Sequence, residues 1–497
     1  MKFQTPTPPF LAMPIDSSPS RQFPPLPQFS GMNAPSRIEC HIKDLEVVGE
    51  LPLALQGTWY RCGPDPQYPP MLGDDIYING DGAVSAFGFA NGRVDFKMRY
   101  VRTQRFEAEG AAHRSLFGLY RNPFTDHASV RGLDRGTANT TAFVHAGRLF
   151  ALKEDSLPYE LDPVTLETKG RHDFGGKLRS RTVTAHPKRD PETGEWLFFG
   201  YEAAGDASKD VAFCVADKHG ALVREEWFEA PYAAMQHDFA VTRDYVIFSV
   251  FPTVCDLDRM KAGGTHWMWD GALDTWIGVM RRDGSVKDMR WFRRPACYSY
   301  HVANAFNTGS QITIDLCVSE RNVFPYVPAR DGSAHDPEAN APFLTRWSFD
   351  ANNPESSFAS RVLSPIPGEL PRIDDRVSMH PHRFIYYGGI DPSKSQLVAG
   401  PIGLGSNHLV RVDTQTGGVT ALFLSDTTTF QEPQLVPVPG AEGLLLAVVD
   451  HHDTGLASVV VLNAADIAAG PIAQIKLPMR LRDAFHGDWA PSHPQTI

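Results

Sequence analysis

Patterns that mark membrane, nucleic-acid and nucleotide-cofactor proteins are missing from this sequence. In its 497 residues, no apolar run approaches the ~20 residues that a membrane-spanning helix needs. Basic residues form no long run and the formal net charge is −11, which argues against nucleic acid as a partner. There is no P-loop and no strand–GxGxxG–helix unit, and the glycines of "NGDGAVSAF" indicate a strand turn. We therefore expect no membrane signal and no organic cofactor.

Paired cysteines and a signal peptide are missing as well. The six cysteines stand singly, without a C-x-x-C pair, which indicates reduced thiols and a cytoplasmic protein. The first 30 residues are broken by prolines and lack the apolar core of a signal peptide. We expect residues 1–36 to form a proline-rich tail and residues 37–497 to form a single domain.

Long amphipathic helical patterns are scarce, and short apolar runs take their place. Examples are "YVIFSVF", "ITIDLCV" and "ASVVVLNA", separated by Asp/Gly turn text such as "LDPVTLET" and "VDTQTGGVTALF". Turns centred near residues 163, 218 and 283 lie 55 and 65 residues apart, a spacing that suits a repeated four-stranded antiparallel sheet. These patterns predict an all-β propeller of seven or eight blades, with two stacked sandwiches as the alternative fold.

Four histidines occur in similar apolar settings, in "VTAHPK", "AMQHDFAVT", "YSYHVANAF" and "AFHGDW". They are His186, His237, His301 and His486, and their intervals of 51, 64 and 185 residues correspond to one, one and three blades. Four histidines at like positions would meet on the propeller axis. Neutral imidazoles suit Fe, Zn, Cu and Ni, and open positions would let Fe(II) bind O₂. Since the protein has 18 histidines, ordinary core or surface roles remain the alternative.

Two other histidine pairs look more like metal ligands locally, in "MHPH" and "DHHD". Both pairs lie among polar or turn residues. We therefore predict surface loops for His380, His382, His451 and His452.

Histidines that bind a metal usually donate their other ring N–H to a carboxylate or a carbonyl. Three glutamates occur in text that favours burial: Glu154 in "FALKEDSLPYELD", Glu369 in "PGELPRID" and Glu432 in "FQEPQLVP". Each of them, taken alone, could also lie on a solvated face.

Together, these motifs identify a family. "LQGTWYRCGPDPQYPP", "ANTTAFVHAGRLFALKEDSLPYELDP", "TAHPK", "QHDFAVT", "ELPRID", "EPQLVP" and "LRDAFHGDW", in this order over residues 37–490, resemble the carotenoid cleavage oxygenases. The resemblance implies a seven-bladed β-propeller with loops capping the active-site face and Fe²⁺ on its axis. It implies iron ligation by the four histidines. It also implies that Glu154, Glu369 and Glu432 are the partners of His237, His301 and His486, leaving His186 without a glutamate.

Within the family, "RSLFGLYRNPFTDHASVRGLDRGTANTT" is most similar to the microbial branch that acts on phenylpropanoids. In stilbene-cleaving members a tyrosine and a lysine hold the substrate's 4-hydroxyl. The resemblance places the tyrosine at Tyr100, as the catalytic and substrate-binding candidate, and puts Leu133 at the lysine position. An aliphatic residue there favours smaller phenylpropenes over stilbenes. Candidate wall residues are Phe306, Trp59 and Phe324.

The resemblance thus implies O₂-dependent cleavage of the alkene bond outside the ring of 4-hydroxyphenylpropenoids such as isoeugenol and 4-vinylguaiacol, to give vanillin-type aldehydes. The partners expected are a small aromatic alkene and O₂. One alternative is a stilbene or apocarotenoid substrate on the same fold. Another is a propeller that serves only as a binding scaffold.

Overall fold

The computed structural model describes residues 21–400 and 405–492 and is built mostly of strands. Its only α-helices, within these residues, are α1 (Gln104–Ala112), α2 (Leu257–Lys261) and α3 (Pro354–Ser357). None of the helices described is long and apolar enough to cross a membrane. The prediction of a β-protein with little helix is confirmed.

The predicted N-terminal tail is partly described. Residues 1–20 lie outside the described part, whereas residues 21–36 run along the body of the protein. Arg480 donates hydrogen bonds to the carbonyl oxygens of Ala34 (3.0 Å) and Pro35 (2.7 Å), and Phe29 and Met32 are buried. This second half of the tail is therefore attached to the domain.

Most of the sheets are antiparallel units of four strands that follow each other along the sequence. The first contains β10 (Lys188–Arg189), β11 (Trp196–Tyr201), β12 (Asp210–Ala216) and β13 (Leu222–Glu229). The second contains β14 (Ala240–Val241), β15 (Tyr245–Val250), β18 (Thr275–Arg281) and β19 (Arg290–Arg294), with β16 (Thr253–Cys255) and β17 (Trp267–Trp269) forming a separate pair. The third contains β20 (Tyr298–Thr308), β21 (Gln311–Ser319), β22 (Phe343–Asp350) and β23 (Ala359–Val362). The fourth contains β24 (Gly368–Arg372), β25 (Phe384–Gly389), β26 (His408–Asp413) and β27 (Val419–Leu422).

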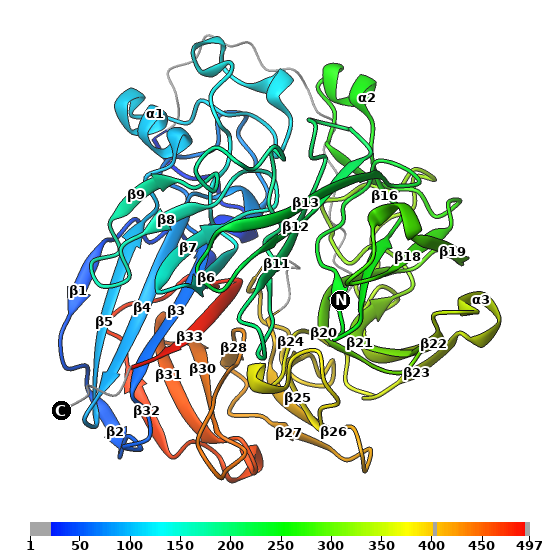
Figure 1. Cartoon of the computed structure of the whole chain (residues 1–497). Coiled ribbons are helices and arrows are strands. Elements are labelled where there is room, and N and C mark those ends of the chain that lie inside the picture. Colours follow the sequence, from blue (N-terminus) through cyan, green and yellow to red (C-terminus); the bar gives the residue numbers. More distant parts are fainter. Residues whose placement is uncertain (1–20, 401–404, 493–497) are drawn as a thin grey trace.

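Two larger sheets join the beginning of the sequence to its end (Figure 1). One contains β2 (Val47–Gly49), β28 (Thr428–Phe430), β29 (Gln434–Val436), β30 (Leu444–His451), β31 (Leu456–Asn463) and β32 (Ala473–Lys476). The other has nine strands in the order β1 (Cys40–Ile42), β5 (Arg93–Tyr100), β4 (Gly82–Ala90), β3 (Gly57–Pro64), β33 (His486–Pro491), β6 (Thr141–His145), β7 (Arg148–Leu152), β8 (Tyr159–Leu161) and β9 (Thr168–Arg171). In the nine-stranded sheet, β33 pairs with β3 over six residue pairs but meets β6 at a single parallel pair, His486 with Thr141.

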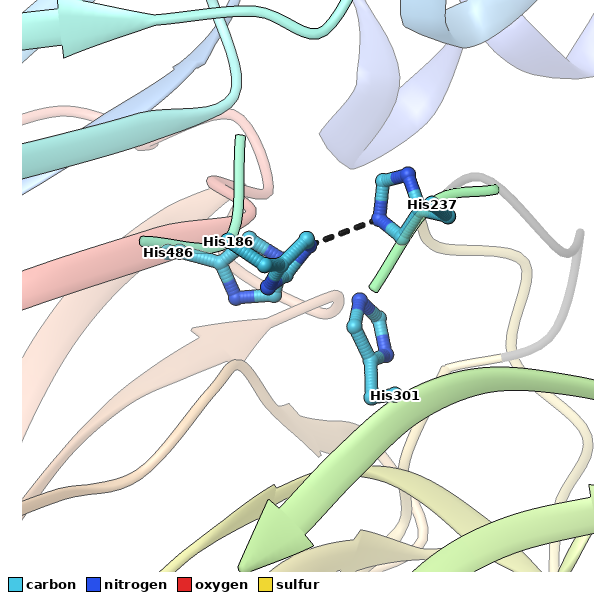
Figure 2. A group of neighbouring side chains, drawn as sticks. All are labelled: His186, His237, His301 and His486. Carbon is cyan, nitrogen blue, oxygen red and sulfur yellow. Dashed lines mark hydrogen bonds between the residues drawn. The ribbon is translucent and has the colours of Figure 1, made fainter. Parts of the chain in front are cut away.

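The four histidines singled out from the sequence lie at corresponding points of these sheets (Figure 2). His186 and His237 come just before β10 and β14, His301 lies on β20, and His486 begins β33. The strands β10, β14 and β20 are each the first strand of their sheet in sequence order. Residues far apart in the sequence therefore meet where these sheets come together.

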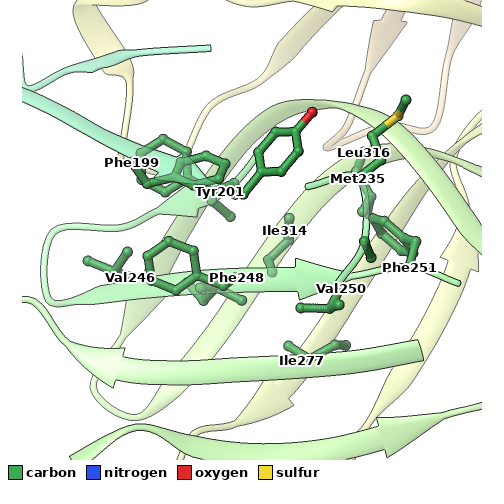
Figure 3. Close-up of a cluster of buried hydrophobic side chains, with 14 of the residues drawn as sticks. Phe199, Tyr201, Met235, Val246, Phe248, Val250, Phe251, Ile277, Ile314 and Leu316 are labelled. Carbon is green, nitrogen blue, oxygen red and sulfur yellow. The ribbon is translucent and has the colours of Figure 1, made fainter. Parts of the chain in front are cut away.

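A large apolar core packs neighbouring sheets against one another (Figure 3). It includes Phe199 on β11, Phe248 on β15, Ile277 on β18 and Ile314 on β21, all at most 1% exposed. Burial of apolar area stabilises a fold by about 25 cal/mol per Å². Such packing from sheet to sheet holds the first strands, and with them the histidines, in place.

Candidate metal centre

His186, His237, His301 and His486 form one cluster at the centre of the fold. Ring nitrogens of all four lie within 4.8 Å of one another. The Nε2 atoms of His186 and His237 are 2.7 Å apart, and the rings of His186 and His486 meet edge to face with centroids 4.4 Å apart (Figure 2). Three of the four are buried and His186 is half-buried.

Three of these imidazoles are oriented by a buried carboxylate. The Nδ1 atom of His237 lies 3.0 Å from Oε1 of Glu154, that of His301 lies 2.6 Å from Oε2 of Glu369, and that of His486 lies 2.7 Å from Oε1 of Glu432. With the Nδ1 proton donated to a carboxylate, the lone pair of Nε2 is left for a cation. The structure thus brings together the three pairs that the resemblance implies.

Among the described residues, no glutamate lies within hydrogen-bond distance of His186. Its Nδ1 atom lies 4.0 Å from Oδ2 of Asp238, whose Oδ1 is 2.7 Å from the Nζ of Lys188. The fourth histidine therefore differs from the other three, as the resemblance implied.

The environment favours neutral imidazoles beside ionised carboxylates. Burial lowers the pKa of His486 to about 4 and holds that of His186 well below its ordinary value. Burial alone would raise the pKa of Glu154, but the contact with His237 outweighs it and the pKa is lowered. A metal needs this protonation state, because only a deprotonated ring nitrogen can bind it.

A divalent transition metal fits the cluster. Nε2 of His301 is buried and has no hydrogen-bond partner in residues 21–400 and 405–492, an arrangement that leaves a strong acceptor unused. The donors that converge are all imidazole nitrogens, a set that suits Fe, Zn, Cu or Ni rather than Ca²⁺ or Mg²⁺. These four residues could therefore hold the metal that the sequence predicts.

Two cavities meet at the cluster, and both border His301 and His486. The smaller, of about 60 Å³, is called the aromatic cavity here; its other lining residues include Tyr120, Lys153, His237, Tyr300, Phe324 and Phe485. The larger, of about 500 Å³, is the polar cavity, and its lining includes His186, Lys188, Arg189, Asp238, Arg372 and Asp488. Both cavities have apolar and charged lining residues, and the larger one has more of the charged side chains.

A tyrosine and a lysine lie side by side in the wall of the aromatic cavity. The Nζ atom of Lys153 is 4.7 Å from the centroid of the Tyr120 ring, and Lys153 is only 3% exposed. The hydroxyl of Tyr120 is buried and has no hydrogen-bond partner within the described part of the protein. Both groups can therefore bind a polar atom of a molecule in this cavity.

The positions that the resemblance implies for the tyrosine and the lysine, Tyr100 and Leu133, do not line either cavity. Tyr100 packs against Phe106, with centroids 5.1 Å apart, and lines neither cavity. Leu133 is 40% exposed and lines a separate groove of about 670 Å³. Residues 101–140 contain only α1 and short 3-10 turns, so no strand alternation shows which side chains face inward. The one signal was Lys153 itself, directly before Glu154.

Of the three predicted wall residues, one lines a cavity at the cluster and two do not. Phe324 lines the aromatic cavity, whereas Trp59 stacks on Phe87 in the core, with centroids 5.6 Å apart. Phe306 lines neither cavity and meets His382 edge to face at 5.9 Å. His382 is itself buried, with Nδ1 2.9 Å from Nδ2 of Asn304, so the prediction that it lies on a surface loop is wrong.

Comparison with known proteins identifies the family. The model of the retinal pigment epithelial membrane protein family (RPE65) matches residues 33–491. The sequence is 44% identical to an isoeugenol monooxygenase of Pseudomonas nitroreducens over 94% of this chain and 98% of that protein. It is 42% identical to isozyme III of a lignostilbene-α,β-dioxygenase of Sphingomonas paucimobilis, with the same shares covered. The crystal structure of a Pseudomonas brassicacearum lignostilbene dioxygenase matches with a TM-score of 0.92 at 43% identity, over 95% of this chain and 100% of that one. The protein therefore belongs to the RPE65 family, the family of the carotenoid cleavage oxygenases, as its motifs predict.

Proposed function

We propose that this oxygenase uses Fe²⁺ to cleave the propenyl or vinyl double bond of 4-hydroxyphenylpropenoids, such as isoeugenol and 4-vinylguaiacol, with O₂ to give vanillin-type aldehydes. The observation that carries the proposal is the four-histidine cluster, backed by three carboxylates, at the edge of a cavity that offers a tyrosine and a lysine. The isoeugenol monooxygenase and the lignostilbene dioxygenase among its relatives support it.

The fold proposed for this chemistry is a seven-bladed propeller. The nine-stranded sheet divides at the single parallel pair between β33 and β6 into two antiparallel sheets. These two, the four four-stranded sheets and the sheet of β28 to β32 make seven units, and the histidines lie where they converge. We also propose one domain over residues 37–497 and a cytoplasmic location, which the six free cysteines support.

The protein's own residues would bind and activate the substrate. Iron held by the four histidines would supply the redox chemistry that activates O₂. The Tyr120 hydroxyl and the Lys153 ammonium would donate to the substrate's 4-hydroxyl oxygen, and the ammonium favours its ionised form. An ionised phenol pushes electron density through the ring into the alkene, which then reacts more readily with an electrophile. The rings of Tyr300 and Phe324 would form the wall beside the planar substrate.

The reaction needs no external reductant. Isoeugenol and O₂ together contain the atoms of vanillin and acetaldehyde, and 4-vinylguaiacol and O₂ those of vanillin and formaldehyde. A 4-hydroxystilbene is the second candidate substrate. Lys153 favours this substrate, because a tyrosine with a lysine is the pair expected of stilbene-cleaving members. The argument against stilbenes depends on Leu133, which does not line the cavity.

Oxygen uptake by the iron-loaded protein tests the proposal without any added cofactor. Isoeugenol, 4-vinylguaiacol, resveratrol and an apocarotenal would be offered separately and the aldehydes identified. Vanillin from the first two is the expected result. Uptake with resveratrol or the apocarotenal alone would overturn the proposed substrate class. No uptake with any of the four compounds would overturn the proposed function.

A further inference from the structure

A series of hydrogen bonds continues outward from Glu154, the carboxylate partner of His237. The hydroxyl of Tyr201 donates to Oε1 of Glu154 at 3.4 Å, the same oxygen that faces Nδ1 of His237. The hydroxyl of Tyr201 in turn accepts a hydrogen bond from Nη1 of Arg121 at 2.6 Å. The Arg121 guanidinium thus polarises the hydroxyl toward the carboxylate.

Arg121 is itself fixed from several sides. Its guanidinium lies 5.0 Å from the ring centroids of both Tyr201 and Trp267, and its Nη2 pairs with Glu202. His266 joins the two, with Nδ1 2.8 Å from the carbonyl oxygen of Arg121 and Nε2 3.0 Å from Oε2 of Glu202. Arg121 and Glu202 are both at least 95% buried, although both border the groove of about 670 Å³ that Leu133 also lines.

The other two carboxylates of the cluster have different partners. Glu369 accepts from its own neighbour, the backbone N–H of Leu370, and among the described residues its buried Oε1 has no partner. Glu432 accepts from the backbone N–H of Gly487 and forms an ion pair with Arg372 at 3.7 Å. Within the described part of the protein, Glu154 is therefore the one of the three that accepts a hydrogen bond from a side-chain hydroxyl.

The supported carboxylate belongs to the histidine on the substrate side. His237 borders the aromatic cavity and not the polar one. Arg121 directly follows Tyr120, and Glu154 directly follows Lys153, so the network is attached through the backbone to Tyr120 and to Lys153. We propose that Tyr201 and Arg121 are positioning residues that hold Glu154, and through it His237, in the orientation that binds the metal. The inference rests on the proposed function, in which the four histidines bind the metal.

Replacement of Tyr201 by phenylalanine tests the role. Tyr201→Phe keeps the buried ring and removes only the hydroxyl between Arg121 and Glu154. Affinity for Co²⁺ alone would be measured by competition with a chelator, together with the visible absorption of the bound ion. Loss of a direct carboxylate partner typically costs 10- to 100-fold in metal affinity, so this more distant change is expected to cost about 3- to 10-fold.

The protein offers a matched control. Tyr386 is also a buried tyrosine, whose hydroxyl contacts Glu442, and Glu442 pairs with Arg411 at 2.9 Å; these three line neither cavity. Tyr386→Phe is expected to bind Co²⁺ as the unmodified protein does, with the same absorption. If Tyr201→Phe does not fold, Arg121→Lys, with Arg411→Lys as its control, is expected to weaken Co²⁺ binding by at least about twofold. Glu202 is left unchanged because it forms a second possible metal-binding group with Cys255 and His266.

Each result has one meaning. Co²⁺ affinity and absorption unchanged in Tyr201→Phe, or reduced equally in Tyr386→Phe, would overturn the positioning role. The same holds for Arg121→Lys and its control. Failure of the unmodified protein to bind Co²⁺ would instead overturn the metal site and the proposed function with it.

Discussion

Tyr300 lies flat on the imidazole of His237, with ring centroids 3.7 Å apart and planes 6° from parallel. It also meets Phe324 edge to face at 4.5 Å. The position of the His237 ring is therefore limited by Glu154 at one nitrogen and by Tyr300 over one face.

This stack predicts that Tyr300→Leu weakens metal binding while Tyr300→Phe does not. Aromatic pairs contribute about 0.5–1.5 kcal/mol beyond their buried area, which is about 2- to 10-fold in affinity. Chelator competition with Fe²⁺ would measure the difference. Equal affinities for the two variants would show that the stack does not orient His237.

Lys153→Met is expected to reduce kcat/KM for isoeugenol by about 10- to 100-fold, because a hydrogen bond to a charged group contributes about 1.5–3 kcal/mol. The 4-O-methyl ether of isoeugenol, which cannot ionise, should lose far less. Leu133→Lys is the matched control and is expected to leave the ratio of isoeugenol to resveratrol turnover unchanged. An equal loss for the phenol and its ether would contradict the assignment of Lys153.

His237→Ala is expected to abolish stable iron binding, measured as metal content after dialysis. His382→Ala removes another buried histidine, one that lines neither cavity, and should retain iron. Full iron occupancy and activity in His237→Ala would remove His237 from the ligand set.

The metal-free protein should lose stability as the pH falls from 7 to 5. Burial lowers the pKa of His486 from 6.5 to about 4, so the unfolded protein takes up a proton in this range before the folded one does. For His486 alone the loss is about 2 kcal/mol between these two pH values. Urea unfolding at both pH values, compared with His486→Asn, would measure it. An identical pH dependence in the two proteins would show that His486 is not held neutral by the fold.

Residues whose role is indicated by their immediate neighbours in the sequence could be predicted. The candidate metal centre is made of such residues. The four histidines each stand in apolar text beside a strand, and the repeat of the sheets gives their spacing. The glutamates follow from the need of an imidazole for a hydrogen-bond partner, and Glu154, Glu369 and Glu432 all lie beside the predicted histidines.

Residues whose role depends on packing between distant segments could not be predicted. The resemblance implies Tyr100 and Leu133 for the tyrosine and lysine positions. The tyrosine and lysine that line the aromatic cavity, Tyr120 and Lys153, each lie 20 residues further along the sequence. His382 stands in polar text, and its burial depends on Asp315 of β21, whose Oδ2 lies 3.0 Å from its Nε2.

The single strand β33 has a consequence for how the protein is made. This strand pairs with β3 and begins with His486. During synthesis, about 420 residues are added after β3 before the strand that pairs with it is made. Until then one side of β3 is an unpaired strand edge, which other polypeptides can join. A nascent polypeptide holds three of the four histidines and an open edge, so the four-histidine cluster can form only after the last strand has been made.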